Sequence, residues 1–275
     1  MSRKLFCELS PTTYKISRQK NILKRKINDT LSNQHFAKEK TTDPLPILIY
    51  EHKSLIRRVL GNIDLQLQEN KAHNLSLATP NLNGILIKPN EVFSFWRLLG
   101  NATADKGYRE GLTISNGTPS SGIGGGMCQF TNLIHWMILH TPLTIIEHHH
   151  HDALDLFPDY NRQIPFGTGT SIAYNYLDYR FKNTTNNTYQ LICYTDEKYL
   201  CGELRALQPQ AYTYHIKADN EYFSKEEDIV YRNGEVYRYT INPTTGNIHE
   251  KTLLRTNHAR VMYDTTNLEI TETKK

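Results

Sequence analysis

Hydrophobic residues recur at helical spacing in one stretch near the middle of the chain, from Ser120 to His140. The apolar positions of this stretch lie three or four residues apart or side by side, as on one face of a helix: Phe130, Leu133, Ile134, Met137 and Ile138. A glycine-rich loop precedes these positions, and Pro142 follows them. Because proline cannot continue a helix, the pattern predicts one central helix that ends near His140.

Short runs of β-branched, aromatic and alternating apolar residues elsewhere in the chain predict strands. These runs cover 85–87, 92–95, 143–147, 172–176, 189–194 and 199–204, and the last two predict a hairpin. After Gln208 the chain becomes rich in Tyr and Val, and we expect hairpin turns at Asn233-Gly234 and at Pro243 to Gly246.

The N-terminal part carries weaker helical patterns. Residues 15–40 are rich in lysine and weakly helical, without a good cap. A helix is expected over 56–67, where apolar residues recur at helical spacing, and a short helix or strand over 75–78, ending at Thr79-Pro80. The sequence thus predicts an α+β fold in which the central helix packs against a mainly antiparallel sheet. We expect a basic helical N-terminal arm (1–46), a central domain (47–207) and a C-terminal extension rich in β-hairpins (208–275).

Charge is unevenly distributed along the chain. The whole chain of 275 residues has a formal net charge of +4, but the first forty residues hold ten basic and three acidic residues. Such an arm either binds an anionic membrane surface or forms a solvated helix face, and no nucleic-acid partner is expected. We find no secretory signal and no apolar run long enough to cross a membrane, so we expect a cytoplasmic protein, or one peripheral to the membrane through its arm.

The candidate nucleophile is Cys128, which stands where the glycine-rich loop meets the central helix. A thiol in the first turn of a helix lies near unpaired N–H groups and the positive end of the dipole, which lowers its pKa. Gly124, Gly125 and Gly126 leave room for another backbone or for a substrate to come close. The plainer interpretation is that Cys128 is a small buried residue where the loop and the helix join tightly. The other cysteines (Cys7, Cys193 and Cys201) form no C-x-x-C pair, and we expect reduced thiols.

Four histidines, His148 to His151, follow the predicted strand that leaves the central helix. If they continue that strand, His149 and His151 point one way while His148 and His150 point the other, so one pair can reach the thiol. Cys128, His149 and His151 also match the ligand types of a catalytic zinc site, but consecutive histidines are not a zinc spacing, and we expect no metal. The glycine-rich loop lacks the spacing and the lysine of a phosphate cradle, and we expect no cofactor.

Several segments of the sequence resemble the VanW family. They are NLNGILIKPNEVFSFWRL (81–98), GLTISNG (111–117), GGGMCQ (124–129), LHTPLTII (139–146) and DYRFKN (178–183). The resemblance implies a link to glycopeptide (vancomycin) resistance and to the bacterial cell wall. VanW-like domains in some cell-wall proteins act as L,D-transpeptidases, whose cysteine attacks a peptide bond before a terminal D-residue and passes the acyl group to an amine.

Transferred to this chain, the resemblance makes Cys128 the nucleophile and His151 the general base, with His149 as the second choice. Gln129 and the backbone of Gly124, Gly125 and Gly126 then line the substrate site, and the partner is a peptidoglycan precursor or muropeptide. The family often has an Asp at the position of Gly169. If that Asp orients the histidine in the family, Asp178 is the residue that would take this role here. It also usually has an Arg at the position of His148. The alternative that stays open is a non-catalytic accessory or binding protein of a resistance cluster.

Overall fold

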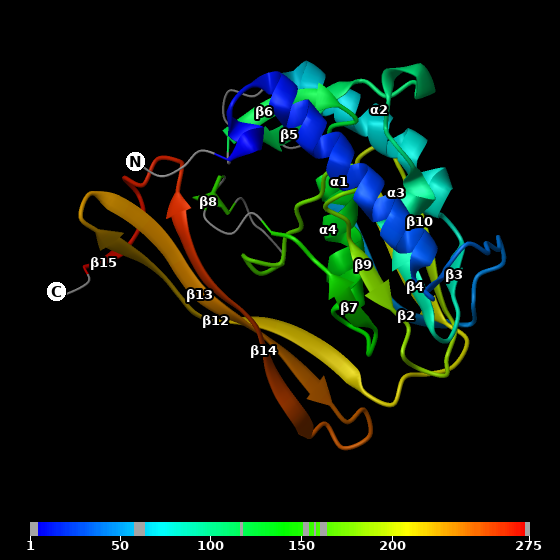
Figure 1. Ribbon diagram of the computed structural model, residues 1–275. Helices are drawn as coiled ribbons and strands as arrows, with labels where there is room; N and C mark the ends of the chain where they lie inside the picture. Colours follow the sequence, from blue (N-terminus) through cyan, green and yellow to red (C-terminus); the bar gives the residue numbers. More distant parts are fainter. Residues whose placement is uncertain are drawn as a thin grey trace.

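The computed structural model describes residues 5–57, 64–115, 118–150, 154–156, 158–159 and 164–272. The predicted α+β fold is confirmed: helices and two small sheets, one mixed and one antiparallel, form one body, and a long sheet curves past it (Figure 1). The helices of the described residues are α1 (Pro11–Leu31), α2 (Leu65–Leu82), α3 (Phe95–Leu99) and α4 (Met127–Ile138), with 3-10 turns at Phe6–Glu8 and Ala104–Lys106.

Two four-stranded sheets build the body. One has the order β1-β4-β9-β7, formed by His35–Phe36, Glu91–Ser94, Arg180–Lys182 and Thr144–Glu147. The other has the order β2-β11-β10-β3, formed by Ile47–Leu55, Tyr199–Ala206, Tyr189–Thr195 and Ile85–Ile87. The expected hairpin is therefore present as β10 and β11. Cys193 pairs with Gly202 in it, and the cysteines are free thiols.

The long sheet has the order β15-β12-β13-β14-β8, formed by Ile270–Glu272, Thr213–Glu226, Ile229–Ile241, Ile248–Val261 and Leu154–Asp155. A separate antiparallel pair consists of β5 (Glu110–Ser115) and β6 (Thr118–Ile123), and residues 116–117 between them lie outside the described residues. Of the two turns expected in the long sheet, the one at Pro243 to Gly246 is confirmed, because Asn242 Oδ1 accepts the N–H groups of Thr244 and Thr245.

The turn expected at Asn233-Gly234 is wrong, because both residues lie inside β13. The chain reverses instead near Glu227, which has a φ of 56°. Asn233 donates a hydrogen bond from Nδ2 to Ser224 Oγ on the neighbouring strand at 2.8 Å, and Gly234 lies opposite a bulge in β12. A cross-strand partner and a bulge thus outweigh the local preference of the Asn-Gly pair for a turn.

The N-terminal half differs from the sequence prediction at two helices. The helix expected over 56–67 lies largely outside the described residues, because these omit 58–63; Ile56 and Arg57 are not helical, and α2 begins at Leu65 with Asp64 as its N-cap. The break expected at Pro80 is wrong, since α2 continues to Leu82. Proline leaves the carbonyl of Ser76 without its usual helical donor, and the Thr79 hydroxyl donates to that carbonyl at 3.3 Å.

Helix α1 is better capped than its sequence suggests, because Ser10 and Thr13 form a reciprocal capping box and Pro11 occupies the first turn. It also docks on the body. Arg25 donates from Nη2 to Glu147 of β7 at 2.6 Å, and Asp29 accepts from both terminal nitrogens of Arg180 at 2.7 and 2.8 Å. We call these two ion pairs the α1 clamp.

Helix α4 lies at the centre of the core, as the sequence predicts. Phe130, Leu133, Ile134 and Met137 are almost completely buried. A Cβ atom at Gly202 of β11 would meet Met137 Cε at 2.6 Å, so the glycine allows the helix to approach the sheet closely. This packing holds α4 against the sheet that contains β2 and β11.

Candidate active site at the start of helix α4

The glycine-rich join before α4 is pressed against other backbone. A Cβ atom at Gly125 would lie 2.2 Å from the carbonyl carbon of Gly111 in β5, and Asn74 of α2 donates to the Gly125 carbonyl at 2.9 Å. Gly126 is the N-cap, with a φ of 112°, and a Cβ atom there would lie 2.6 Å from Lys71 Cγ. The close approach of a second backbone, which the sequence predicted, therefore involves the β5–β6 hairpin.

Cys128 is the second residue of α4 and is partly accessible to solvent. Burial raises the pKa of the Cys128 thiol, and a backbone hydrogen bond from Ile172 lowers it only in part. The lowered pKa expected from the helix dipole is therefore wrong in direction. Removal from water penalises the thiolate more than the first turn of the helix favours it.

A polar face runs along α4 from Cys128 through Asn132 to His135, on a helix that is otherwise largely apolar. These residues are four and three positions apart, so they lie above one another. The loop 169–172 covers them. Thr170 donates to Asn132 Oδ1 from its N–H at 2.6 Å and from its hydroxyl at 2.8 Å, and that hydroxyl also hydrogen-bonds Thr131. The loop is thereby fixed directly against the turn that carries the thiol.

The histidine segment alternates in direction, as expected, but its inward pair is His148 and His150. His148 donates from Nε2 to the Gly169 carbonyl at 2.9 Å and stacks on His135 with ring centroids 4.3 Å apart. A Cβ atom at Gly169 would lie 3.7 Å from His150 Nε2, which places that imidazole beside the same loop. His149 points the other way and donates to Glu147 Oε1 at 3.0 Å.

The histidine of α4, His135, has a buried imidazole. Its Nδ1 is 3.0 Å from the hydroxyl of Tyr179, which is completely buried. Burial lowers the pKa of His135 well below its ordinary value, and the neighbouring imidazoles of His148 and His150 lower it further. His135 is therefore neutral in the folded protein.

The other predicted site residues lie as follows. His151 lies outside the described residues. Gln129 donates from Nε2 to Ser54 Oγ and the Leu55 carbonyl of β2, both at 2.9 Å, so its amide points toward that strand. A Cβ atom at Gly124 would meet the Cβ of Ala102 at 2.7 Å.

Asp178 accepts hydrogen bonds from Ser94 Oγ at 2.6 Å and from Arg180 Nε at 2.7 Å. Among the described residues, the structure does not bring its carboxylate to an imidazole, so the proposed move of the orienting role to Asp178 is not seen. A side chain at position 169 would instead point at His150, as the distance from Gly169 shows.

The arrangement brings a thiol, a buried amide and three imidazoles onto one helix face and the loop above it. Within the described ranges, no hydrogen bond joins Cys128 Sγ to an imidazole, and no group of three or more His, Cys, Asp or Glu side chains is placed to hold a metal ion. The same ranges contain no helix that is long and apolar enough to cross a membrane.

The sequence prediction missed Asn132, His135 and Thr170. A signal for the first two was present, because polar residues at positions 128, 132 and 135 interrupt an apolar helix on one face only. Thr170 lies forty-two positions beyond Cys128 in an irregular loop, and no local pattern marks it.

Comparison with known proteins shows the family of this chain. A family model described as VanW like protein matches residues 70–205, which include Cys128, Asn132, His135 and His148 to His150. The chain belongs to the VanW family.

The chain is 39% identical over 220 residues to the vancomycin B-type resistance protein VanW of Enterococcus faecalis, covering 80% of this chain and 79% of that protein. It is also 29% identical over 121 residues to the uncharacterized protein YoaR of Bacillus subtilis, covering 43% of this chain and 37% of YoaR. No solved structure matches the chain.

Proposed function

We propose that this VanW-family protein is a cysteine-dependent acyl transferase that acts on peptidoglycan stem peptides ending in a D-residue, and that it contributes in this way to vancomycin resistance. The observation that supports the proposal is the position of Cys128 at the start of α4, beneath the loop that also contacts His148 and His150. The name of the Enterococcus relative connects the family with vancomycin resistance.

In the proposed reaction an imidazole accepts the proton of the Cys128 thiol, and the sulfur attacks the carbonyl carbon before the terminal D-residue. The N–H groups of the first turn, beyond Gly126, donate to the oxygen of the tetrahedral intermediate. The peptide bond then breaks, the D-residue leaves as an amine with the imidazole's proton, and a thioester remains. An acceptor amine attacks the thioester, returns a proton and releases the thiol.

The described imidazole that best fits the role of base is His150, because its Nε2 lies beside Gly169, one residue before Thr170. His148 donates its Nε2 hydrogen to the Gly169 carbonyl and so helps to hold the segment in place. Burial raises the thiol pKa, so the thiolate forms by transfer of its proton to a base and not from the helix dipole alone.

The test is incubation of the protein with a disaccharide tetrapeptide, followed by intact mass measurement. We expect an acyl adduct on Cys128, its loss in Cys128→Ser, and its retention in the matched control Cys193→Ser. An adduct rate that falls strongly in His150→Gln but not in His149→Gln assigns the base. A wild-type protein that forms no adduct with stem peptides contradicts the proposal.

A second candidate function is that of a non-catalytic binding protein of a resistance cluster. It is favoured by the burial of the Cys128 thiol and by the absence of a thiol–imidazole hydrogen bond among the described residues. Calorimetry separates the two functions: a pure binding protein binds peptidoglycan precursors equally well as wild type and as Cys128→Ala, and leaves their mass unchanged.

A further inference from the structure

Helix α1 presents an apolar stripe to solvent. Four large aliphatic side chains, each separated from the next by seven or four positions, are 53%, 59%, 48% and 78% exposed: Ile16, Leu23, Ile27 and Leu31. Side chains at this spacing share one face of a helix, and at about 1.5 Å of rise per residue the stripe is roughly 22 Å long. Single exposed apolar side chains are ordinary, but a continuous row of them is typical of a surface that binds a partner or a membrane.

The body of the protein does not cover the stripe, because the opposite face of α1 docks on that body. The docked face carries Ile22, the one buried residue of α1, together with Arg25 and Asp29 of the α1 clamp. Arg25 also donates from Nη2 to the Tyr176 carbonyl at 3.0 Å. Figure 1 shows α1, in dark blue, lying across the outside of the body. The stripe therefore faces away from the two small sheets.

Lysines accompany the stripe along its length. Lys20 and Lys24 lie within it and on one side of it, and Lys26 lies on the other side. All three are exposed, and within the described ranges none of them forms an ion pair. The acidic residue of α1 is Asp29, which binds Arg180 on the docked face. The outer face of α1 thus combines apolar side chains with positive charge and holds no carboxylate.

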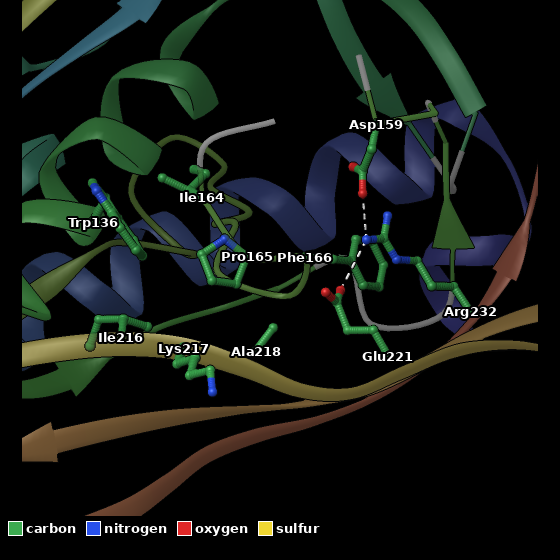
Figure 2. Close-up of a pocket in the computed structure, with 10 residues that line it drawn as sticks. All are labelled: Trp136, Asp159, Ile164, Pro165, Phe166, Ile216, Lys217, Ala218, Glu221 and Arg232. Atoms are coloured by element: carbon green, nitrogen blue, oxygen red, sulfur yellow. Dashed lines mark hydrogen bonds and ion pairs between the residues drawn. The ribbon is translucent and has the colours of Figure 1, made fainter. Parts of the chain in front are cut away.

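The charges of another concave surface, by contrast, are paired within the protein. Figure 2 shows a groove of about 310 Å³, lined by Phe166, in which Arg232 binds Asp159 at 2.5 Å and Glu221 at 3.0 Å. Asp155 lies 3.5 Å from the same guanidinium. The lysines on the outer face of α1 have no such partners in the described part of the chain, so their charge is available to a negatively charged surface outside it.

We propose that α1 binds along the surface of an anionic lipid membrane. The stripe lies at the boundary between headgroups and acyl chains, and the lysines lie at the negatively charged phosphate headgroups. The sequence left two possibilities for the basic arm, a membrane-binding surface and a solvated helix face. A solvated face is polar, whereas an apolar stripe flanked by lysines is the pattern of a helix that lies in the plane of a membrane surface.

Charge also argues against a second copy of this chain as the partner. In a two-fold contact each α1 would present the same outer face to the other. Such a contact brings lysines near lysines without a carboxylate on either side, whereas an anionic membrane neutralises all of them. The membrane contact does not depend on the proposed acyl transfer, and adduct formation on Cys128 is measured in solution without lipid.

The test is flotation of the full chain with vesicles of phosphatidylcholine alone and with vesicles that contain about one third phosphatidylglycerol. We expect binding to the anionic vesicles to be at least about tenfold tighter, and most of this difference to disappear at high salt. The double variant Leu23→Asn, Ile27→Asn is expected to bind anionic vesicles at least about tenfold more weakly. Leu65→Asn is the matched control, because Leu65 is 69% exposed at the start of α2, outside the stripe.

The contribution of charge is tested with a second pair of variants. Lys20→Gln with Lys24→Gln is expected to weaken binding to anionic vesicles about tenfold and to leave the weak binding to phosphatidylcholine unchanged. The control, Lys53→Gln with Lys198→Gln, removes the same charge from exposed positions of β2 and of the β10–β11 turn. We expect the control to bind both kinds of vesicle as the wild type does.

Fluorescence gives an independent measurement. The two native tryptophans, Trp96 and Trp136, are buried. In Leu23→Trp we therefore expect anionic vesicles to shift the emission to the blue, and in the control Leu65→Trp we expect no shift. Unchanged emission of Leu23→Trp, or equal flotation of the wild type and the double variant in Leu23 and Ile27, overturns the proposal. Dimerisation of the wild type without lipid, seen by ultracentrifugation and abolished in the same double variant, also overturns it.

Discussion

Two buried polar regions of this protein are built in opposite ways. The face of α4 holds neutral groups: a protonated thiol, an amide, hydroxyls and stacked imidazoles. The cluster on the long sheet holds formal charges around Arg232, which also lies over the ring of Phe166 at 4.5 Å. Burial keeps the thiol protonated and His135 neutral, whereas a guanidinium among carboxylates stays charged and suits recognition.

The electrostatics of the two regions show the same difference. Burial lowers the pKa of Arg232, but the hydrogen bond and charge of Asp159 outweigh it and raise the pKa overall. On α4 nothing comparable offsets burial, and the pKa of His135 falls well below its usual value. One region therefore depends on charge pairing and the other on the exclusion of charge, and each can be broken by a different change.

The largest effect is expected from removing the central charge of the long sheet. Arg232→Met removes the guanidinium 3.5 Å from the carboxylate of Asp155, which is 1% exposed. Breaking a buried ion pair from one side costs about 3–5 kcal/mol, so we expect a loss of that size in the free energy of unfolding measured with urea. The matched control Arg260→Met, at an exposed position of β14, is expected to cost less than about 0.5 kcal/mol. Equal losses for both variants contradict the assigned role of Arg232.

A steric change tests the neutral region next. The Cβ atom of Gly125→Ala collides with the Gly111 backbone, which belongs to a paired strand and has little room to move. We expect a loss of about 3 kcal/mol in unfolding free energy, at the upper end for overpacking, together with slower alkylation of Cys128. Gly122→Ala is the control, because its Cβ atom would lie 3.4 Å from Thr113 Cγ2 and is tolerated. An unchanged free energy of unfolding in Gly125→Ala would contradict a rigid join between the glycine-rich loop and α4.

Acid is expected to weaken the neutral region through His140, just beyond α4. Burial lowers the pKa of His140 to about 4, and its ring stacks on Tyr50 with centroids 3.7 Å apart. A folded-state pKa below the unfolded value of about 6.5 means that protons bind the unfolded chain preferentially. The contribution of buried, neutral His140 to the free energy of unfolding is therefore fully present above pH 6.5. It declines by about 2–3 kcal/mol as the pH falls to 4.

Urea titrations at several pH values measure this decline, and His140→Gln is expected to show a shallower slope below pH 6.5 than the wild type. Parallel slopes for the two proteins would show that His140 remains accessible to protons in the folded state.

The smallest effect on stability, and the most specific one, is expected from adding an acid beside His150. Gly169 has no positive φ that would hinder a side chain, and Gly169→Asp directs a carboxylate toward His150 Nε2. We expect the pKa of His150 to rise, with less than about 1 kcal/mol change in stability, and the pH at which Cys128 alkylation is half-maximal to shift. Gly169→Asn is the control, and an identical pH profile for the Asp and Asn variants rules out an electrostatic effect.

The sequence predicted those parts of the fold that depend on neighbours in the chain. Helix α4, the β10–β11 hairpin and the turn at Pro243 to Gly246 all follow from local periodicity and turn residues. The turn predicted at Asn233-Gly234 is wrong because a cross-strand hydrogen bond overrides the local preference. The helix end predicted at Pro80 is wrong because a hydroxyl in α2 replaces the donor that proline lacks.

In the candidate site, too, the sequence predicted only what depends on spacing along the chain. Cys128 and a nearby histidine segment follow from spacing alone. The direction of each imidazole does not, because it depends on where the loop 169–172 docks on α4, and that loop is held by Asn132. The direction of the thiol pKa also requires the burial of Cys128, which a sequence does not show.

The α1 clamp has a practical consequence for anyone who shortens this chain. Glu147 binds Arg25, directly precedes the histidine segment and also accepts a hydrogen bond from His149, so the first helix holds the start of that segment from more than a hundred residues away. A clone trimmed to the family-model match, 70–205, would discard Arg25 and Asp29, the α1 residues of the clamp, and the whole of β2. An inactive fragment of that kind would reflect the cut and not the chemistry, so expression should begin no later than the cap at Ser10.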